Sequence, residues 1–190
     1  MRRPPWRHVV LLLALLFMRG VGAATVTVTT TADSGAGSLR AAVAGAGAGD
    51  TVAFAPGVTG TLTLTSGSIT IDKALVLAGP GAPLLAVVNV GGRVFDVAAS
   101  GAAVAISGLH LSGSGSPPGA NGGAIAHTGG HLSLDAVLID HSSVTAAWNG
   151  GGLGGAVYSP FNAAEGGSSL AIRNSTLDSN QAGKGGAIYL

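Results

Sequence analysis

The feature that most constrains this chain is an internal repeat, a Gly-Gly-Ala-Ile or Gly-Gly-Ala-Val tetrapeptide that occurs three times, 32 and 31 residues apart. Its glycines are Gly122 and Gly123, Gly154 and Gly155, and Gly185 and Gly186. Repeats of about 20–50 residues are typical of solenoids and propellers, because one unit cannot bury its apolar face without stacking on the next. We interpret these glycines as structural residues of such a stack.

A second repeated segment lies between the glycine pairs. Residues 132–140 align without gaps with residues 170–178, and residues 104–112 and 69–77 are looser copies. Within each copy, apolar and polar residues alternate over a few positions. This pattern indicates short β-strands rather than helices.

About three such strands per repeat fit one coil of a right-handed parallel β-helix. The predicted class is therefore all-β, a solenoid of roughly five coils. Ile106, Leu134 and Ile172 hold the same place in three copies, and we expect them to form one column of the core. Aromatic residues make up only 4% of the chain, which agrees with a narrow aliphatic interior. The alternative is a β-sandwich with coincidental glycine pairs.

The sequence predicts three parts. Residues 1–23 have the layout of a secretory signal peptide, with arginines before a short apolar run and small residues at the end, so we expect cleavage after Ala23 or one residue later. The alternative is a retained membrane anchor, although the apolar run is shorter than the roughly 20 residues that span a bilayer. Residues 24–50 are expected to form a cap, a strand followed by a short helix that begins after Ser38. Residues 51–190 are expected to form the coils.

Charge and composition exclude several classes of protein. Removal of the signal peptide takes four of the nine Lys and Arg residues and leaves all eight acidic ones, so the processed chain has a formal net charge of −3. That balance argues against a nucleic-acid partner. Because the chain has no Cys, disulfides and thiolate metal sites are excluded. We expect no transmembrane helix in the processed chain and no cofactor.

The repeats resemble those of a known group of proteins. Gly-Gly-Ala-Ile units that follow Leu-x-Leu patterns are similar to the repeats of polymorphic outer-membrane proteins and of related right-handed parallel β-helix proteins of bacterial surfaces. Residues 25–43 and 50–54 resemble the leader and first coil of such proteins. The polymorphic repeats also carry a Phe-x-x-Asn element, where this chain has Leu177 and Asn180. The resemblance implies export and passenger or adhesin roles, and the wider group includes pectin-lyase-like carbohydrate enzymes.

Three histidines invite a metal-site interpretation. His127 and His131 are four residues apart, and His141 lies further along the chain. Because the Thr-Gly-Gly segment between the first two indicates a turn, we interpret them as solvated turn residues, with a metal site as the alternative.

The acidic residues are scattered. By the repeat register, Asp135 and Arg173 take the same outward position in successive coils, and Asp140 and Asp178 likewise stack at a turn. We expect Asp135 and Arg173 to form an ion pair between coils rather than a catalytic pair. The spacing of Gly150, Gly152 and Gly155 matches a dinucleotide fingerprint, but no βαβ pattern surrounds it, so we interpret it as coincidence.

These observations favour an exported, non-catalytic β-helix of the cell surface or medium, passenger- or adhesin-like, whose partner is a carbohydrate or another host or cell-surface ligand. No catalytic, cofactor-binding or metal-binding residue is assigned. The alternative is the N-terminal part of a polysaccharide lyase or glycoside hydrolase whose catalytic coils lie beyond Leu190. The repeat is interrupted at Leu190. We therefore expect a truncated chain that self-associates through an uncapped last coil.

Overall fold

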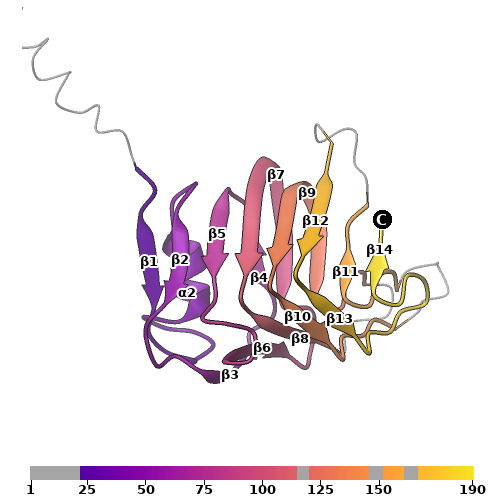
Figure 1. Cartoon of the computed structure of the whole chain (residues 1–190), viewed down its shortest axis with the longest axis horizontal. Coiled ribbons are helices and arrows are strands. Elements are labelled where there is room, and N and C mark those ends of the chain that lie inside the picture. The colour runs from indigo at the N-terminus through magenta and orange to yellow at the C-terminus, as the bar shows by residue number, and fades with distance from the viewer. Residues whose placement is uncertain (1–21, 115–119, 146–151, 161–166) are drawn as a thin grey trace, which may run out of the picture.

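The computed structural model describes residues 22–114, 120–145, 152–160 and 167–190. These residues form a parallel β-solenoid of about five turns with one short helix near its N-terminal end, which confirms the predicted fold class (Figure 1). The predicted signal peptide lies almost wholly outside the described residues, as does Gly150 of the glycine motif. In the part of the chain that the structure describes, no helix is long and apolar enough to cross a membrane.

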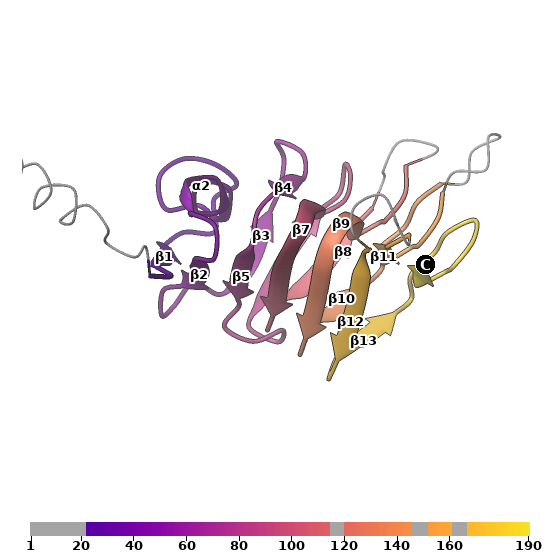
Figure 2. The same cartoon turned by 90° about the horizontal axis from the view of Figure 1, so that it is seen from above.

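The described strands form two sheets, and Figure 2 shows the molecule from above. Because β7 and β9 each pair with different strands along their first and second parts, the strands stack in three columns. The first column contains β2 (Thr51–Phe54), β5 (Leu75–Ala78), the second part of β7 (Phe95–Ser107), the second part of β9 (Ile125–Asp135) and β12 (Ser169–Arg173). The second column contains β3 (Gly60–Thr63), β6 (Leu85–Asn89), β8 (His110–Gly113), β10 (Leu138–Asp140) and β13 (Thr176–Asp178). The third contains β4 (Ile69–Ile71), the first parts of β7 and β9, β11 (Val157–Tyr158) and β14 (Ile188–Tyr189).

The N-terminal end of the stack is covered by one strand and one helix. Strand β1 (Thr25–Val28) pairs in parallel with β2, and α2 (Leu39–Gly45) buries Leu39, Ala42 and Val43 against the core (Figure 2). Ser38 caps this helix, since its hydroxyl accepts a hydrogen bond from the amide of Ala41 at 3.2 Å. A capping hydroxyl at this place satisfies one of the amides that the first turn leaves without a partner.

The core is built from columns of aliphatic residues in register. In the first strand column Leu77 pairs with Ile106, Ile106 with Leu134, and Leu134 with Ile172. Ile106 and Leu134 are each 1% exposed, and Ile172 in the last turn is half-buried. Parallel pairing without a shift places each inward side chain over its equivalent in the next coil, so the interior is continuous from turn to turn.

The repeated glycines form a ladder between coils. Gly122, Gly154 and Gly185 have φ values of +75°, +68° and +62°. The amide of Gly122 donates to Leu153 O at 2.9 Å, and that of Gly154 donates to Lys184 O at 3.0 Å. A Cβ on Gly123 would lie 2.0 Å from Gly155 O, and one on Gly155 would lie 2.0 Å from Gly186 O. The first glycine of each pair therefore supplies the turn, and the second lets neighbouring backbones touch.

Candidate functional site

A polar cleft opens at the corner between the second and third strand columns. Its volume is about 300 Å³, and it lies between the start of β4, the end of β6 and the start of β7. Its lining residues are Gly67, Ser68, Asn89, Gly91, Gly92, Arg93 and Asp96. Three of the seven are glycines, so backbone amides and carbonyls form much of the wall.

Asp96 joins the two sides of the cleft. Its Oδ1 accepts a hydrogen bond from Arg93 Nη1 at 2.7 Å, and its Oδ2 accepts one from the hydroxyl of Ser68. The Arg93 side chain is 23% exposed and that of Asp96 is 32% exposed, so both reach solvent. The guanidinium of Arg93 makes no other hydrogen bond within the described residues, which leaves several of its N–H groups directed to solvent or to a ligand.

Asn89 fixes the loop that forms the floor of the cleft. Its Nδ2 donates to Arg93 O at 2.7 Å, and its Oδ1 accepts from the amide of Gly91 at 3.1 Å. Because Asn89 is 3% exposed, the side chain replaces backbone pairing inside the corner and holds Arg93 at its rim.

A second pair of opposite charges lies behind the cleft. Arg40 of α2 donates to the carbonyls of Gly67 and Ser68 at 2.6 and 2.8 Å, and its Nη2 lies 2.7 Å from Asp33 Oδ1. Burial alone would raise the pKa of Asp33. Hydrogen bonds from Ser66, Arg40 and Thr65 outweigh burial and hold that pKa well below its usual range. The cap helix is thus bound to the rim of the cleft, and the two arginines are balanced by two carboxylates.

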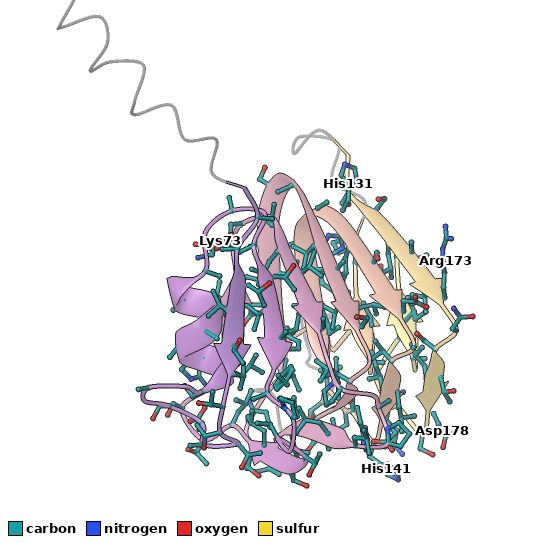
Figure 3. The ribbon with its side chains drawn as sticks, turned by 60° about the vertical axis from the view of Figure 1, so that its left-hand side comes forward. Lys73, His131, His141, Arg173 and Asp178 are labelled. Carbon is teal, nitrogen blue, oxygen red and sulfur yellow. The ribbon has the colours of Figure 1, made fainter. Side chains whose placement is uncertain are left out.

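His110, Asp140 and His141 form a second polar group, on the outer side of the second strand column. Asp140 Oδ1 lies 2.7 Å from His110 Nε2, and its Oδ2 lies 3.5 Å from His141 Nδ1. Asp140 pairs in register with Asp178, as the repeat predicted, and Figure 3 shows His141 and Asp178 at the same lower end of the molecule. Across the described residues, no cluster of three His, Asp or Glu side chains has the arrangement of a metal site.

The interpretation of His127 as a solvated turn residue is wrong, and His131 is solvated but does not lie in a turn. Both lie within β9, because the Thr-Gly-Gly segment forms a bulge in a continuous strand instead of a turn. His127 is 0% exposed, and its Nδ1 lies 2.7 Å from the hydroxyl of Ser159, itself 4% exposed. Its Nε2 lies 3.2 Å from Gly130 O. His131 is exposed and contacts Ser169, at the top of the view in Figure 3.

The buried His127–Ser159 pair could have been found from the repeat. His127 follows Ile125 by two positions, and Ser159 follows Val157 by two. Because Ile125 and Val157 pair in register, the alternation of a strand directs the two polar side chains into the same interior column. Burial, the largest effect, lowers the pKa of His127, while hydrogen bonds from its ring to the backbone of Gly130 and Gly129 oppose that shift.

The predicted ion pair between Asp135 and Arg173 is also wrong. The two residues do pair in register. Within the described residues, however, their charged atoms do not approach within 4.0 Å, and Asp135 Oδ1 accepts instead from Asn174 Nδ2 at 2.8 Å. Figure 3 shows Arg173 extended away from the sheet. A shorter amide in the adjacent turn satisfies the carboxylate, while the flexible arginine remains hydrated.

Comparison with known proteins does not extend the assignment. No family model, curated protein or solved structure matches the chain.

Proposed function

We propose that this chain is an exported, non-catalytic β-solenoid of a bacterial surface or its surroundings, and that it binds a carbohydrate-type ligand through the cleft around Arg93 and Asp96. We also propose, from its repeats, that the chain is related to the polymorphic outer-membrane or pectin-lyase-like proteins. The supporting observation is the balanced charge at the cleft, where the guanidinium of Arg93 is paired with the carboxylate of Asp96, while the Arg40–Asp33 pair behind the cleft is balanced in the same way.

The paired opposite charges of Arg93 and Asp96 favour a neutral ligand over a charged one. An anion would gain from Arg93 but would be repelled by Asp96 only 2.7 Å from it, and a cation would meet the reverse problem. Hydroxyl groups donate and accept, so a neutral polyhydroxylated molecule can use the free guanidinium N–H groups and the glycine backbone together. Since apolar lining is scarce, affinity should be modest, on the order of millimolar.

The outward carboxylates support a non-catalytic role. Asp135 is engaged by Asn174, Asp140 by His110, and Asp96 by Arg93 and Ser68. Each carboxylate thus joins one segment to another. Glycoside hydrolysis needs a different arrangement, two carboxyl groups that face each other across a substrate at about 5–9 Å.

The test is an NMR titration of the chain from residue 24 onward with glucose, glucuronate and glucosamine, which share one ring and differ in charge. We expect amide shifts around Ser68, Gly92 and Asp96, with glucose binding at least threefold more tightly than the charged sugars. Asp96→Asn should weaken glucose binding at least fivefold, whereas Asp178→Asn, at the exposed end of β13, should not. Tighter binding of glucuronate, or no shift with any sugar, would contradict the proposal, as would new reducing ends from an oligosaccharide.

We also propose that the last turn takes part in self-association. Among the described residues, β12 and β13 pair only with the preceding turn, and Leu170, Ile172 and Leu177 remain half-buried. Half-covered aliphatic side chains beside unpaired strand edges favour pairing with another chain. Light scattering should show dimers or larger species, and a charged capping segment added after Leu190 should return the chain to a monomer. A monomer without that segment would contradict this proposal.

A further inference from the structure

Asp50 is a buried carboxylate that no cationic side chain contacts among the described residues. The residue is 7% exposed and lies between the end of the cap and the start of β2. No Lys, Arg or His nitrogen among the described residues lies within 4.0 Å of it. Lys73 lowers the pKa of Asp50 only through a longer-range charge interaction, because its ammonium group lies against Asp72 and Ala44 O. Buried charges in proteins are usually paired in direct contact with an opposite charge, and Asp50 has no such contact among the described residues.

Two backbone amides bind this carboxylate. The amide of Ala24 donates to Oδ1 at 2.7 Å, and the amide of Gly47 donates to Oδ2 at 2.7 Å. Both distances are those of charge-assisted hydrogen bonds. These two bonds, the largest effects, lower the pKa of Asp50. Asp50 is therefore ionised at neutral pH and is aimed at the nitrogen of Ala24.

Ala24 is also the residue that would begin the processed chain if the predicted signal peptide were cut after Ala23. We propose that Asp50 is a receptor for the α-ammonium group that this cut creates at Ala24. The inference rests on the proposed export of the chain. Hydrolysis of the Ala23–Ala24 peptide bond by a signal peptidase consumes one water, leaves a carboxylate on Ala23 and converts the amide nitrogen of Ala24 into an ammonium group. That nitrogen already lies 2.7 Å from Asp50 Oδ1, so cutting turns an existing hydrogen bond into an ion pair without moving the strand.

The geometry selects this cut over its neighbours. A chain that began at Thr25 would lose both the Ala24 amide and the Ala24 carbonyl, which accepts from the amide of Thr51 at 2.8 Å. A chain that began at Ala23 would keep a neutral amide at Ala24 and place its charge one residue further from the carboxylate. Only a start at Ala24 pairs the carboxylate directly, so processing itself would stabilise the capped end of the solenoid.

The experiment compares chains that begin at Ala23, Ala24 and Thr25, released from a removable fusion so that each has a free amino group. At pH 6.5, the chain that begins at Ala24 should have the highest urea midpoint. Its advantage over the Ala23 form should disappear with Asp50→Asn and should persist with Asp72→Asn, a change of an exposed carboxylate. The pKa of the Ala24 amino group, followed by NMR, should lie above that of the Ala23 form.

Equal midpoints for the Ala23 and Ala24 forms, or an advantage that survives Asp50→Asn, would overturn the proposal. Mass spectrometry of the exported chain should find Ala24 first, and a start at Thr25 would also overturn it. If Asp50→Asn fails to fold in either form, acetylation of the Ala24 form supplies the second test, because it removes the charge and should abolish the advantage. Recovery of uncut chain in the cytoplasm would contradict export alone, because the released chains test the Asp50 contact independently.

Discussion

The glycine ladder makes Gly155→Ala the sharpest test of how the coils stack. The added Cβ would lie 2.0 Å from Gly186 O, 2.6 Å from Gln181 N and 2.7 Å from Gln181 O, all backbone atoms of the next coil. No side chain can move away to relieve these contacts, so the coils themselves must separate. Separation would weaken the hydrogen bonds from Gly155 N to Gly185 O at 3.2 Å and from Gly154 N to Lys184 O at 3.0 Å.

The expected cost follows from those two effects. Overpacking costs about 1–3 kcal/mol, and two weakened hydrogen bonds add about 1–2 kcal/mol, so the free energy of unfolding should fall by about 2–5 kcal/mol. The assay is urea denaturation followed by far-ultraviolet circular dichroism. Gly45→Ala is the matched control, because its Cβ would meet no atom within 4 Å at the end of α2, and it should be neutral or stabilise by up to about 1 kcal/mol. An unchanged midpoint for Gly155→Ala would refute the close approach of these coils.

Three further predictions concern the interior and the turns. Leu134→Asp should abolish cooperative unfolding, because it places an unpaired carboxylate where the native side chain is 1% exposed. Ser133→Asp, on the exposed side of the same strand, should fold. The pKa of His127 is lower in the folded chain than in the unfolded one, so the unfolded chain binds more protons below about pH 6.5. The urea midpoint should therefore decrease as the pH is lowered from 7.5 to 5.5, and His127→Gln should make the midpoint less dependent on pH. Ala136 has a φ of +52° and is exposed, so Ala136→Gly should stabilise the chain by about 1 kcal/mol in a thermal melt, whereas Ala171→Gly within β12 should destabilise it.

The repeat predicts the stack because the same physical requirement recurs in every coil. Ile106, Leu134 and Ile172 lie in register, since a two-residue alternation repeated without gaps directs equivalent side chains inward. Ser38 begins the cap helix because a hydroxyl before a helical segment is a local signal. These features depend on neighbours in sequence or on exact repetition, so the sequence carries enough information for them.

The cleft and the environment of the buried His127 depend on contacts between coils, which the local sequence pattern does not specify. Ser68, Asn89 and Asp96 come from three different strands or their ends and meet only after coils of unequal length have stacked. The prediction of a turn at His127 is wrong because a Thr-Gly-Gly segment that suggests a turn forms a bulge in β9. The predicted Asp135–Arg173 ion pair is wrong because matching register brings two side chains to adjacent positions without deciding from which nearby donor the carboxylate accepts a hydrogen bond.

Polar contacts between coils, such as the hydrogen bond between His127 and Ser159, disfavour pairing between the wrong coils of a repetitive chain. The segments that begin at Gly154 and Gly185 are so alike that β9 could pair with β14 instead of β11 without loss of its aliphatic stacking. In that slipped pairing, Leu190 would take the place of Ser159 opposite His127, and the buried Nδ1 would lose its partner. An unsatisfied buried polar group costs about 1–3 kcal/mol, which is a large part of the net stability of a small domain. A buried His–Ser pair that adds little to the free energy of unfolding can therefore decide which coil lies next to which. The order of the coils in turn fixes which outward side chains are neighbours.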